Sequence, residues 1–386
     1  MSILFSSRQL GGIQVKNRFI HSACEDNLAS ESGEVTEEMI RKYRYLARGE
    51  IGLIISSHLF VHDSGRGNRY QAGIHTDEVI PGLKKWVDVV HRNGGLIALQ
   101  LGHAGPQANK ALINREPMGP GNMDDSEIRN IKETFALAAH RAWEAGADGI
   151  QLHAAHGYLL NQFLSPYFNQ REDKWSGDDK NRFGLLGAII SNIKQTMPAG
   201  RIILIKLNTH DHTPEEGILP PLAATYAKWL ADLQIDGLEI SCGTSKGSPW
   251  NMCRGDVPVD EIVRSLPEHL KAKGEKAISS LAGRYPAEEG YNLYAAKTIK
   301  PEIGDLPLIV VGGWRSVEKM EAAMETGDAD FISMCRPFIR EPFLVKRLKE
   351  GRSRAATCKN CNRCLAALPN QMPVRCYYNG FPSESN

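Results

Sequence analysis

The stretch ADGIQLHAAH, residues 147–156, combines the two features that decide the interpretation of the whole sequence. It begins as a short apolar run, which is typical of a strand buried on both faces. It ends in two histidines, His153 and His156, at the point where such a strand would leave the core. If the same combination recurs along the chain, the histidines belong to a shared site and are not an isolated pair of buried polar groups.

Seven further apolar runs of this kind are spread along the chain. Segments with apolar residues at helical spacing, such as EEMIRKYRYLARG and ETFALAAHRAWEAG, separate them and mostly end near glycine. Eight strands alternating with helices predict an α/β fold, and the number eight favours a closed (β/α)8 TIM barrel over an open doubly wound sheet. The absence of a GxGxxG turn after any run also favours the barrel. The seven runs cover residues 17–24, 51–61, 94–105, 201–208, 235–243, 306–313 and 329–338.

The predicted barrel occupies residues 1–350. It starts with an N-terminal hairpin across the barrel bottom, with Gly11 and Gly12 as the turn. A long insertion, residues 244–300, follows the sixth strand, and we expect it to roof the active site because loops of this length are usually functional. Residues 351–386 form a cysteine-rich C-terminal extension.

Composition and charge exclude several classes of protein. The 386 residues are 42% hydrophobic and 24% charged with a net charge of +1, so the sequence has no excess of basic residues for nucleic acid. It also has no apolar run near the ~18 residues of a membrane-spanning helix, and its first residues lack a signal-peptide pattern. We therefore expect a cytoplasmic protein that binds neither nucleic acid nor membrane. In that compartment, clustered cysteines indicate a metal or redox group rather than disulfides.

Polar or reactive residues end several of the predicted strands. Active sites of such barrels lie at the carboxyl ends of the strands and in the loops that follow them. Core packing would explain any one of these residues, but it does not explain the set. They are Cys24, His58, Gln100, His103, His153, His156, Lys206, Cys242, Gly312, Gly313 and Arg336.

Residues 149–177, GIQLHAAHGYLLNQFLSPYFNQREDKWSG, resemble the fourth-strand segment of the old yellow enzyme family of FMN-dependent ene-reductases. VKNRFIHSAC, GGLIALQLGHAG and DADFISMCRPFIREP resemble the first, third and last strand segments, so the resemblance covers nearly the whole chain. It is nearest to the branch that contains 2,4-dienoyl-CoA reductase and trimethylamine dehydrogenase. The resemblance implies an FMN enzyme that takes NAD(P)H as reductant and acts on a small-molecule substrate.

The resemblance also implies which residues hold FMN. Gly312 and Gly313 offer backbone N–H groups to the phosphate, and Arg336 offers a charge, where barrels usually bind phosphate. Gln100 matches the amide at the pyrimidine edge of the flavin, and Lys206 matches the positive charge near N1 and O2. The other predicted flavin contacts are Ala23, Cys24, His58 and Cys335, the last at a position where many members have glycine.

His153 and His156 match the paired donors with which the family binds a substrate carbonyl. Two N–H groups on that oxygen polarise the conjugated alkene for hydride attack. Tyr158 matches the proton donor, since a phenol with a pKa of ~10 stays protonated at neutral pH. Two histidines three residues apart would otherwise indicate a metal site, but no third ligand is obvious nearby. Trp250 and Tyr291 of the insertion are predicted further substrate contacts.

Four of the eight cysteines lie in the last tenth of the chain. Their spacing of two, two and eleven residues suits either an iron–sulfur cluster or a tetrahedral zinc ion. The resemblance favours [4Fe–4S]. Relatives with a cluster continue into two dinucleotide-binding domains, whereas this sequence stops ten residues after Cys376, so an active cluster would need a separate electron-transfer partner protein. The predicted ligands are Cys358, Cys361, Cys364 and Cys376.

We therefore expect NAD(P)H-driven reduction of an activated C=C bond, with the reductant and the substrate reacting in turn. One alternative is an amine or N-methyl dehydrogenase or demethylase that passes electrons from FMN through the cluster. An aromatic bowl for a cationic amine would favour it, whereas the histidine pair favours carbonyl activation. A second alternative is a non-catalytic, zinc-stabilised barrel subunit. The sequence leaves the oligomeric state open, a homo-oligomer included.

Overall fold

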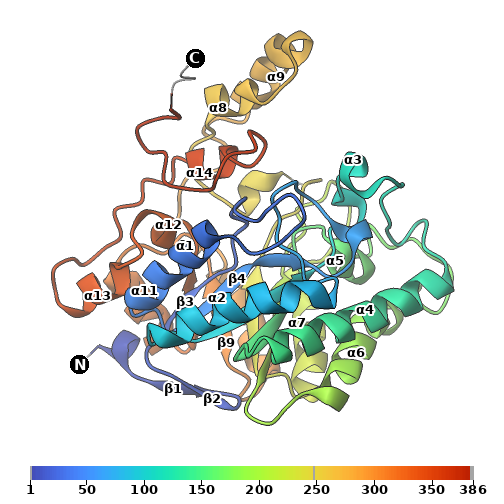
Figure 1. Cartoon of the computed structure of the whole chain (residues 1–386), viewed down its shortest axis with the longest axis horizontal. Coiled ribbons are helices and arrows are strands. Elements are labelled where there is room, and N and C mark those ends of the chain that lie inside the picture. Colours follow the sequence, from blue (N-terminus) through green and yellow to red (C-terminus); the bar gives the residue numbers. More distant parts are fainter. Residues whose placement is uncertain (1, 247, 383–386) are drawn as a thin grey trace.

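A computed structural model describes residues 2–246 and 248–382 (Figure 1). Eight parallel strands close into a barrel in the order β10-β3-β4-β5-β6-β7-β8-β9, which confirms the predicted (β/α)8 fold. Nearly every residue of these strands is buried, because the barrel interior covers one face and the helices cover the other. The strands are β3 (Phe19–His21), β4 (Leu53–Phe60), β5 (Ile97–Gly102), β6 (Gly149–Ala154), β7 (Ile202–Asn208), β8 (Gly237–Ser241), β9 (Leu308–Val311) and β10 (Phe331–Met334).

Amphipathic helices form the outer layer, and their ends follow local capping rules. The side chain of Thr36 caps the start of α1, and Asp124 and Glu127 form a capping box at the start of α4. The longer helices are α1 (Glu37–Arg48), α2 (Ile80–Arg92), α4 (Asp125–Glu144), α6 (Asp179–Thr196), α7 (Pro220–Asp232), α9 (Glu268–Ser279) and α11 (Val317–Glu325). The shorter ones are α3 (Lys110–Ile113), α5 (Leu159–Leu164), α8 (Val259–Arg264), α10 (Leu293–Ile299), α12 (Arg336–Arg340), α13 (Leu344–Lys349) and α14 (Arg363–Ala366).

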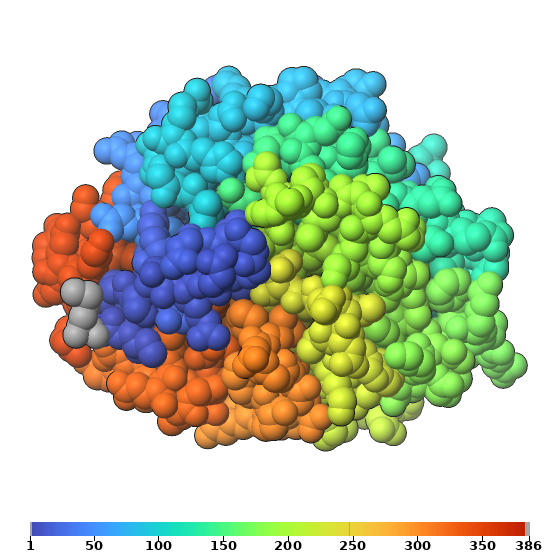
Figure 2. Space-filling model, turned by 90° about the horizontal axis from the view of Figure 1, so that it is seen from below, coloured from blue at the N-terminus to red at the C-terminus, as the bar shows by residue number. Residues whose placement is uncertain are grey.

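The N-terminal hairpin seals one end of the barrel, as predicted. Strands β1 (Arg8–Leu10) and β2 (Ile13–Val15) pair antiparallel around a Gly11–Gly12 turn. Leu10 and Val15 are fully buried in the same apolar cluster as residues of the barrel strands. Figure 2 views the molecule from below and shows the dark blue N-terminal segment lying across part of this face. The opening is therefore left to the carboxyl ends of the strands.

The insertion and the C-terminal extension meet above the barrel. Figure 1 shows α8 and α9 standing away from the barrel beside α14. Arg363 of α14 forms an ion pair with Glu261 of α8 at 2.5 Å, and Asn370 donates a hydrogen bond to the carbonyl of Glu261 at 2.7 Å. The extension also reaches the loop after β3, where Val374 N donates to the carbonyl of Asp26 at 2.8 Å. The extension is therefore tied to both the insertion and the barrel.

Six 3-10 turns complete the described elements: η1 (Ile3–Phe5), η2 (Asp63–Gly65), η3 (Asp77–Val79), η4 (Gly105–Gln107), η5 (Pro249–Asn251) and η6 (Lys300–Glu302). Within residues 2–246 and 248–382, no helix has the length and apolar character that crossing a membrane requires.

Candidate active site

One cavity opens at the carboxyl ends of the strands. Side chains from every barrel strand end contribute to its wall, and residues of the insertion and the C-terminal extension complete it. Most of the residues singled out in the sequence lie here together. The predicted site residues that line the cavity are Ala23, Cys24, His58, Gln100, His153, His156, Tyr158, Lys206, Tyr291 and Cys335.

Six of the predicted strand-end, flavin and substrate residues lie outside this lining. Two of them, His103 and Cys242, are each 1% exposed and do not reach the cavity. Trp250 is only 4% exposed and packs within η5, while its neighbours Pro249 and Met252 reach the cavity. Arg336 lies between the insertion and the extension, where its Nη1 donates to the carbonyl of Arg254 at 2.8 Å and to Asn362 Oδ1 at 2.6 Å. Gly312 and Gly313 follow β9 beside the cavity and are treated with the flavin below.

The cavity floor is a buried polar network around Glu239, a residue of β8 that the sequence analysis did not single out. Ser22 and Ser333 donate hydroxyl hydrogen bonds to Glu239 Oε1 at 2.7 and 2.6 Å. Gln151 donates to Oε2 at 2.9 Å. Burial alone would raise the pKa of Glu239, but Lys206 and these donors outweigh it and hold the pKa below its usual value. The carboxylate is therefore charged at neutral pH.

Lys206 and Gln100 rise from this network toward the cavity. Lys206 Nζ lies 3.4 Å from Glu239 Oε2 and donates to Ser22 Oγ at 2.8 Å. Gln100 Nε2 donates to Gln151 Oε1 at 2.7 Å. Lys206 is 3% exposed, so its charge depends on Glu239 for compensation. The network fixes both side chains that the sequence analysis expects at the flavin.

Four rings meet on one side of the cavity. The centroids of His153 and His156 are 5.1 Å apart, and those of His153 and Tyr158 are 4.8 Å apart. His58 completes the cluster, 5.3 Å from Tyr158 and 5.9 Å from His153. The structure thus brings the predicted donor pair and the predicted proton donor together, with His58 beside them.

Burial keeps these rings uncharged. It holds the pKa of His153 and of His156 well below the usual range, helped by the positive charge of Lys206, and it lowers the pKa of His58 to about 4. Burial, with the nearby Glu25 carboxyl, raises the pKa of the Tyr158 phenol above its usual value. At neutral pH the site therefore presents neutral imidazoles and a protonated phenol.

A tight turn after β6 sets the directions of these side chains. His156 has a φ of +63° and Gly157 a φ of +76°, both in the left-handed region, and the chain then enters α5 at Tyr158. The imidazole Nε2 of His156 is 2.8 Å from Ser241 Oγ. His153 Nδ1 is buried without a hydrogen-bond partner among the described residues.

Glu25 is a cavity residue that the sequence analysis missed. Burial raises the pKa of its carboxyl to about 8, against the opposing hydrogen bond from Asn68. The group is therefore mostly protonated at neutral pH. Its position directly after Cys24 was the available signal. Glutamate is usually exposed, however, and the sequence alone does not show that this side chain faces the cavity.

The glycines after β9 and the cavity donors fit FMN. Gly312 and Gly313 have φ values of +156° and +69°, and a Cβ on Gly313 would collide with the carbonyl of Glu288. Their amides have no hydrogen-bond acceptor among the described residues, as a phosphate cradle requires. Gln100 and Lys206 offer the donors and the charge that a flavin ring needs.

The four C-terminal cysteines line a second, smaller cavity, shared with Arg336 and Arg340. Arg340 Nη1 donates to Cys376 Sγ at 3.2 Å. Asn360 and Asn362 have φ values of +55° and +56°, and these two left-handed residues curve the backbone around the cavity. No group of three or more ligand side chains in the described residues converges closely enough to hold a single metal ion. The cysteines thus surround a space without meeting at one point.

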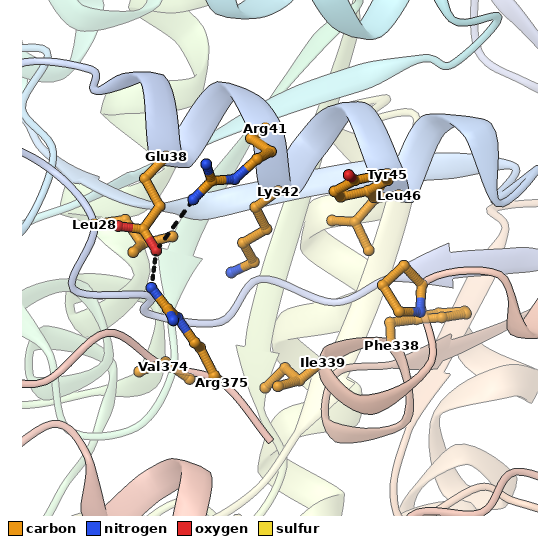
Figure 3. A pocket seen from close by; sticks show the side chains of 11 residues that line it. Leu28, Glu38, Arg41, Lys42, Tyr45, Leu46, Phe338, Ile339, Val374 and Arg375 are labelled. Atoms are coloured by element: carbon orange, nitrogen blue, oxygen red, sulfur yellow. Dashed lines mark hydrogen bonds and ion pairs between the residues drawn. The ribbon is translucent and has the colours of Figure 1, made fainter. Parts of the chain in front are cut away.

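A groove beside the cysteines is lined by several charged side chains that form ion pairs. It lies between α1 and the segments that contain Phe338 and Arg375, and Figure 3 shows Glu38 reaching both Arg41 and Arg375 across it. Lys42, at its inner side, forms an ion pair with Asp26 at 3.4 Å. Arg41 and Arg375 share one carboxylate, and such exposed ion pairs contribute little to stability.

Comparison with known proteins gives consistent results. A family model described as "NADH:flavin oxidoreductase / NADH oxidase family" matches residues 3–244 and 281–355. The chain is 28% identical to a 4,4'-dithiodibutanoate disulfide reductase of Rhodococcus erythropolis, over 95% of this chain and 93% of that protein. It is 30% identical to an NADH oxidase of Thermoanaerobacter brockii, over 97% of this chain but 56% of that protein. The chain therefore spans nearly all of the first relative and about half of the second.

A solved structure of 2-naphthoyl-CoA reductase in complex with 2-naphthoyl-CoA has the same fold. It superposes with a TM-score of 0.84 at 24% identity, covering 97% of this chain and 56% of that one. The match extends beyond the barrel into the insertion and the C-terminal extension, since nearly the whole chain is covered.

Proposed function

Because this chain belongs to the NADH:flavin oxidoreductase / NADH oxidase family and is thus an FMN-dependent oxidoreductase, we propose that it reduces activated C=C bonds with NAD(P)H. The observation that carries the proposal is the pair of neutral imidazoles, His153 and His156, beside the protonated phenol of Tyr158 in one cavity. This set can hold a carbonyl oxygen and supply a proton, which are the two tasks of alkene reduction that a protein performs.

The residues divide these tasks as follows. Bound FMN supplies hydride transfer, which no side chain can perform. His153 and His156 donate hydrogen bonds to the oxygen of an α,β-unsaturated carbonyl compound and stabilise the negative charge that develops there. Tyr158 gives its proton to the α-carbon, and the raised pKa of the phenol keeps that proton available across neutral pH. Lys206 and Gln100, which the Glu239 network holds in place at the cavity floor, would orient the bound cofactor.

The cavity gives less support to a cationic amine as substrate. An amine would require open aromatic faces. Trp250 does not line the cavity, and the guanidinium of Arg254 already lies 5.0 Å from the ring centroid of Tyr291. The hydroxyl of Tyr291 is also engaged, donating to the carbonyl of Met252 at 2.6 Å. These contacts leave the histidine pair as the main polar feature available to a substrate.

The test is an anaerobic half-reaction experiment. We expect the purified protein to show an oxidised flavin spectrum that NAD(P)H bleaches, and 2-cyclohexenone to restore it. Bleaching by an alkylamine such as trimethylamine, with no response to NAD(P)H or to cyclohexenone, would instead establish the amine dehydrogenase. A protein that binds no flavin would support the non-catalytic subunit and refute both enzymes.

We further propose that Cys358, Cys361, Cys364 and Cys376 hold a [4Fe–4S] cluster. Their spacing of two, two and eleven residues and their position around one cavity support this proposal. Leu365, directly after Cys364, also lines the active-site cavity. A cluster here would adjoin the flavin site, and a separate protein would then exchange electrons with it.

Metal analysis separates the cluster from zinc. We expect about four irons per chain in anaerobically purified protein and a brown absorbance that dithionite bleaches. The Cys361→Ala variant should lose the iron, whereas Cys242→Ala, which alters a buried thiol after β8, should keep it. One zinc and no iron per chain would show that the cysteines form a structural zinc site instead.

A further inference from the structure

Cys24 and Cys335 stand side by side at the rim of the barrel. Cys24 follows β3 and Cys335 follows β10, and these neighbouring strands pair with Met334 opposite His21. Ser22 N donates to the carbonyl of Met334 at 2.9 Å, which holds the two strand ends together. Both cysteines line the active-site cavity, and neither is in a disulfide. Cys24 Sγ donates to the carbonyl of Glu25 at 3.4 Å.

The two thiols are not equivalent. The neighbouring Cys335 thiol, followed by the positive charge of Lys42, lowers the pKa of Cys24 despite burial. The neighbouring Cys24 thiol and burial raise the pKa of Cys335. Cys24 is thus the better nucleophile, and Cys335 retains its proton beside it. A pair of this kind suits sequential attack, in which one thiolate attacks first and its neighbour follows.

We propose that Cys24 and Cys335 form a redox-active dithiol that reduces small organic disulfides. The proposal rests on the proposed function for its source of electrons, since NAD(P)H acting through FMN must return the pair to thiols. It adds an activity in which the chain's own sulfur atoms, and not the histidine pair, react with the substrate.

The exchange balances in two displacements. The Cys24 thiolate attacks one sulfur of RSSR, which breaks the substrate S–S bond, forms a mixed disulfide and releases RS⁻. Cys335 then loses its proton and attacks Cys24 Sγ, which releases a second RS⁻ and leaves a Cys24–Cys335 disulfide. Substrate gains two electrons and two protons, and the protein pair loses them. NAD(P)H returns two electrons as hydride through the flavin, and solvent supplies the second proton.

Nearby groups support this chemistry. The protonated carboxyl of Glu25 faces the same cavity and can protonate a leaving thiolate. Lys42 belongs to the ion pair with Asp26 at the inner side of the groove in Figure 3, so its charge is held in place. Leu365 and Leu368 of the extension and Met252 of the insertion give the cavity an apolar wall, which suits the carbon chains of a small organic disulfide.

A single-turnover experiment tests the dithiol without using turnover of the flavin. Anaerobic protein with oxidised flavin, and no NAD(P)H, is mixed with 2-hydroxyethyl disulfide. Free thiols are then blocked, and peptides are mapped by mass spectrometry. We expect about two thiols released per chain and a peptide that links Cys24 to Cys335. Because the flavin is oxidised, these electrons can come only from the protein.

Variants assign the two steps. Cys335→Ala should release about one thiol and keep a mixed disulfide on Cys24. Cys24→Ala should release none from this site, and Cys242→Ala should match the parent protein. With NAD(P)H present, both site variants should lose disulfide turnover by at least about ten-fold.

The outcomes separate this proposal from the proposed function. Absence of the Cys24–Cys335 peptide, or full disulfide turnover by Cys24→Ala, refutes the dithiol even if cyclohexenone is reduced. Formation of the linked peptide in a protein that does not reduce cyclohexenone supports the dithiol and refutes alkene reduction.

Discussion

Replacement of Glu239 by leucine should lower the free energy of unfolding by about 3–5 kcal/mol, because it leaves the buried charge of Lys206 without compensation. Lys206 is 3% exposed and lies 3.4 Å from the carboxylate. Ser22, Ser333 and Gln151 would lose their shared acceptor at the same time. Denaturant unfolding of the parent and the variant, followed by circular dichroism, measures the loss.

The double variant Lys206→Met/Glu239→Leu is the matched control. Removing both charges replaces the ion pair by apolar groups of similar size, which is often far less costly than removing one partner. We therefore expect the double variant to recover most of the stability lost by Glu239→Leu. If the double variant is as unstable as the single one, the loss comes from packing or from the hydroxyl donors, and the uncompensated lysine is not its cause.

Replacement of His153 by alanine should lower kcat/KM for cyclohexenone by about 10²–10³-fold, the range typical for removing one donor to a developing oxyanion. The imidazole has a buried nitrogen without a partner and lies in the ring cluster with His156 and Tyr158. Rapid mixing of reduced enzyme with enone measures the step directly. The variant should lower the rate at which the enone reoxidises the reduced flavin.

His75 provides the control for this variant. Like His153 it has a buried Nδ1 without a partner, but it packs against Phe60 outside the active-site cavity. His75→Ala removes the same chemical group at a site that the substrate does not reach, so the reoxidation rate should stay within about three-fold of the parent. Reoxidation of His153→Ala at the parent rate would show that the histidine does not hold the carbonyl oxygen.

The fold was predictable because its signal is spread over the whole sequence. Each barrel strand is buried on both faces, so its sequence is a nearly continuous apolar run. Such a run is easily distinguished from the sequence of an amphipathic helix. His153, Lys206 and Gln100 were identifiable for a related reason, since a polar residue that ends such a run stands out. The closed barrel then places these strand ends together.

The residues that were missed depend on closure itself. Glu239 looks like one carboxylate in an apolar strand, and only the assembled barrel shows donors from three other strands converging on it. Cys24 and Cys335 were each predicted as flavin contacts, but their proximity was not, because they lie near opposite ends of the sequence and become neighbours only when β10 pairs with β3. Trp250 and Met252 lie in a short irregular part of the insertion, so the sequence could not tell that Trp250 is packed away while Met252 reaches the cavity.

The short segment that contains Leu365 and Leu368 serves two cavities at once. Its leucines form wall of the active site, and Cys361 and Cys364 line the neighbouring cavity on its other side. If these cysteines bind metal as proposed, exchange of this segment between homologous genes would transfer metal ligands and part of the substrate-binding wall together. Substrate selectivity and the route of electron transfer would then change in one step.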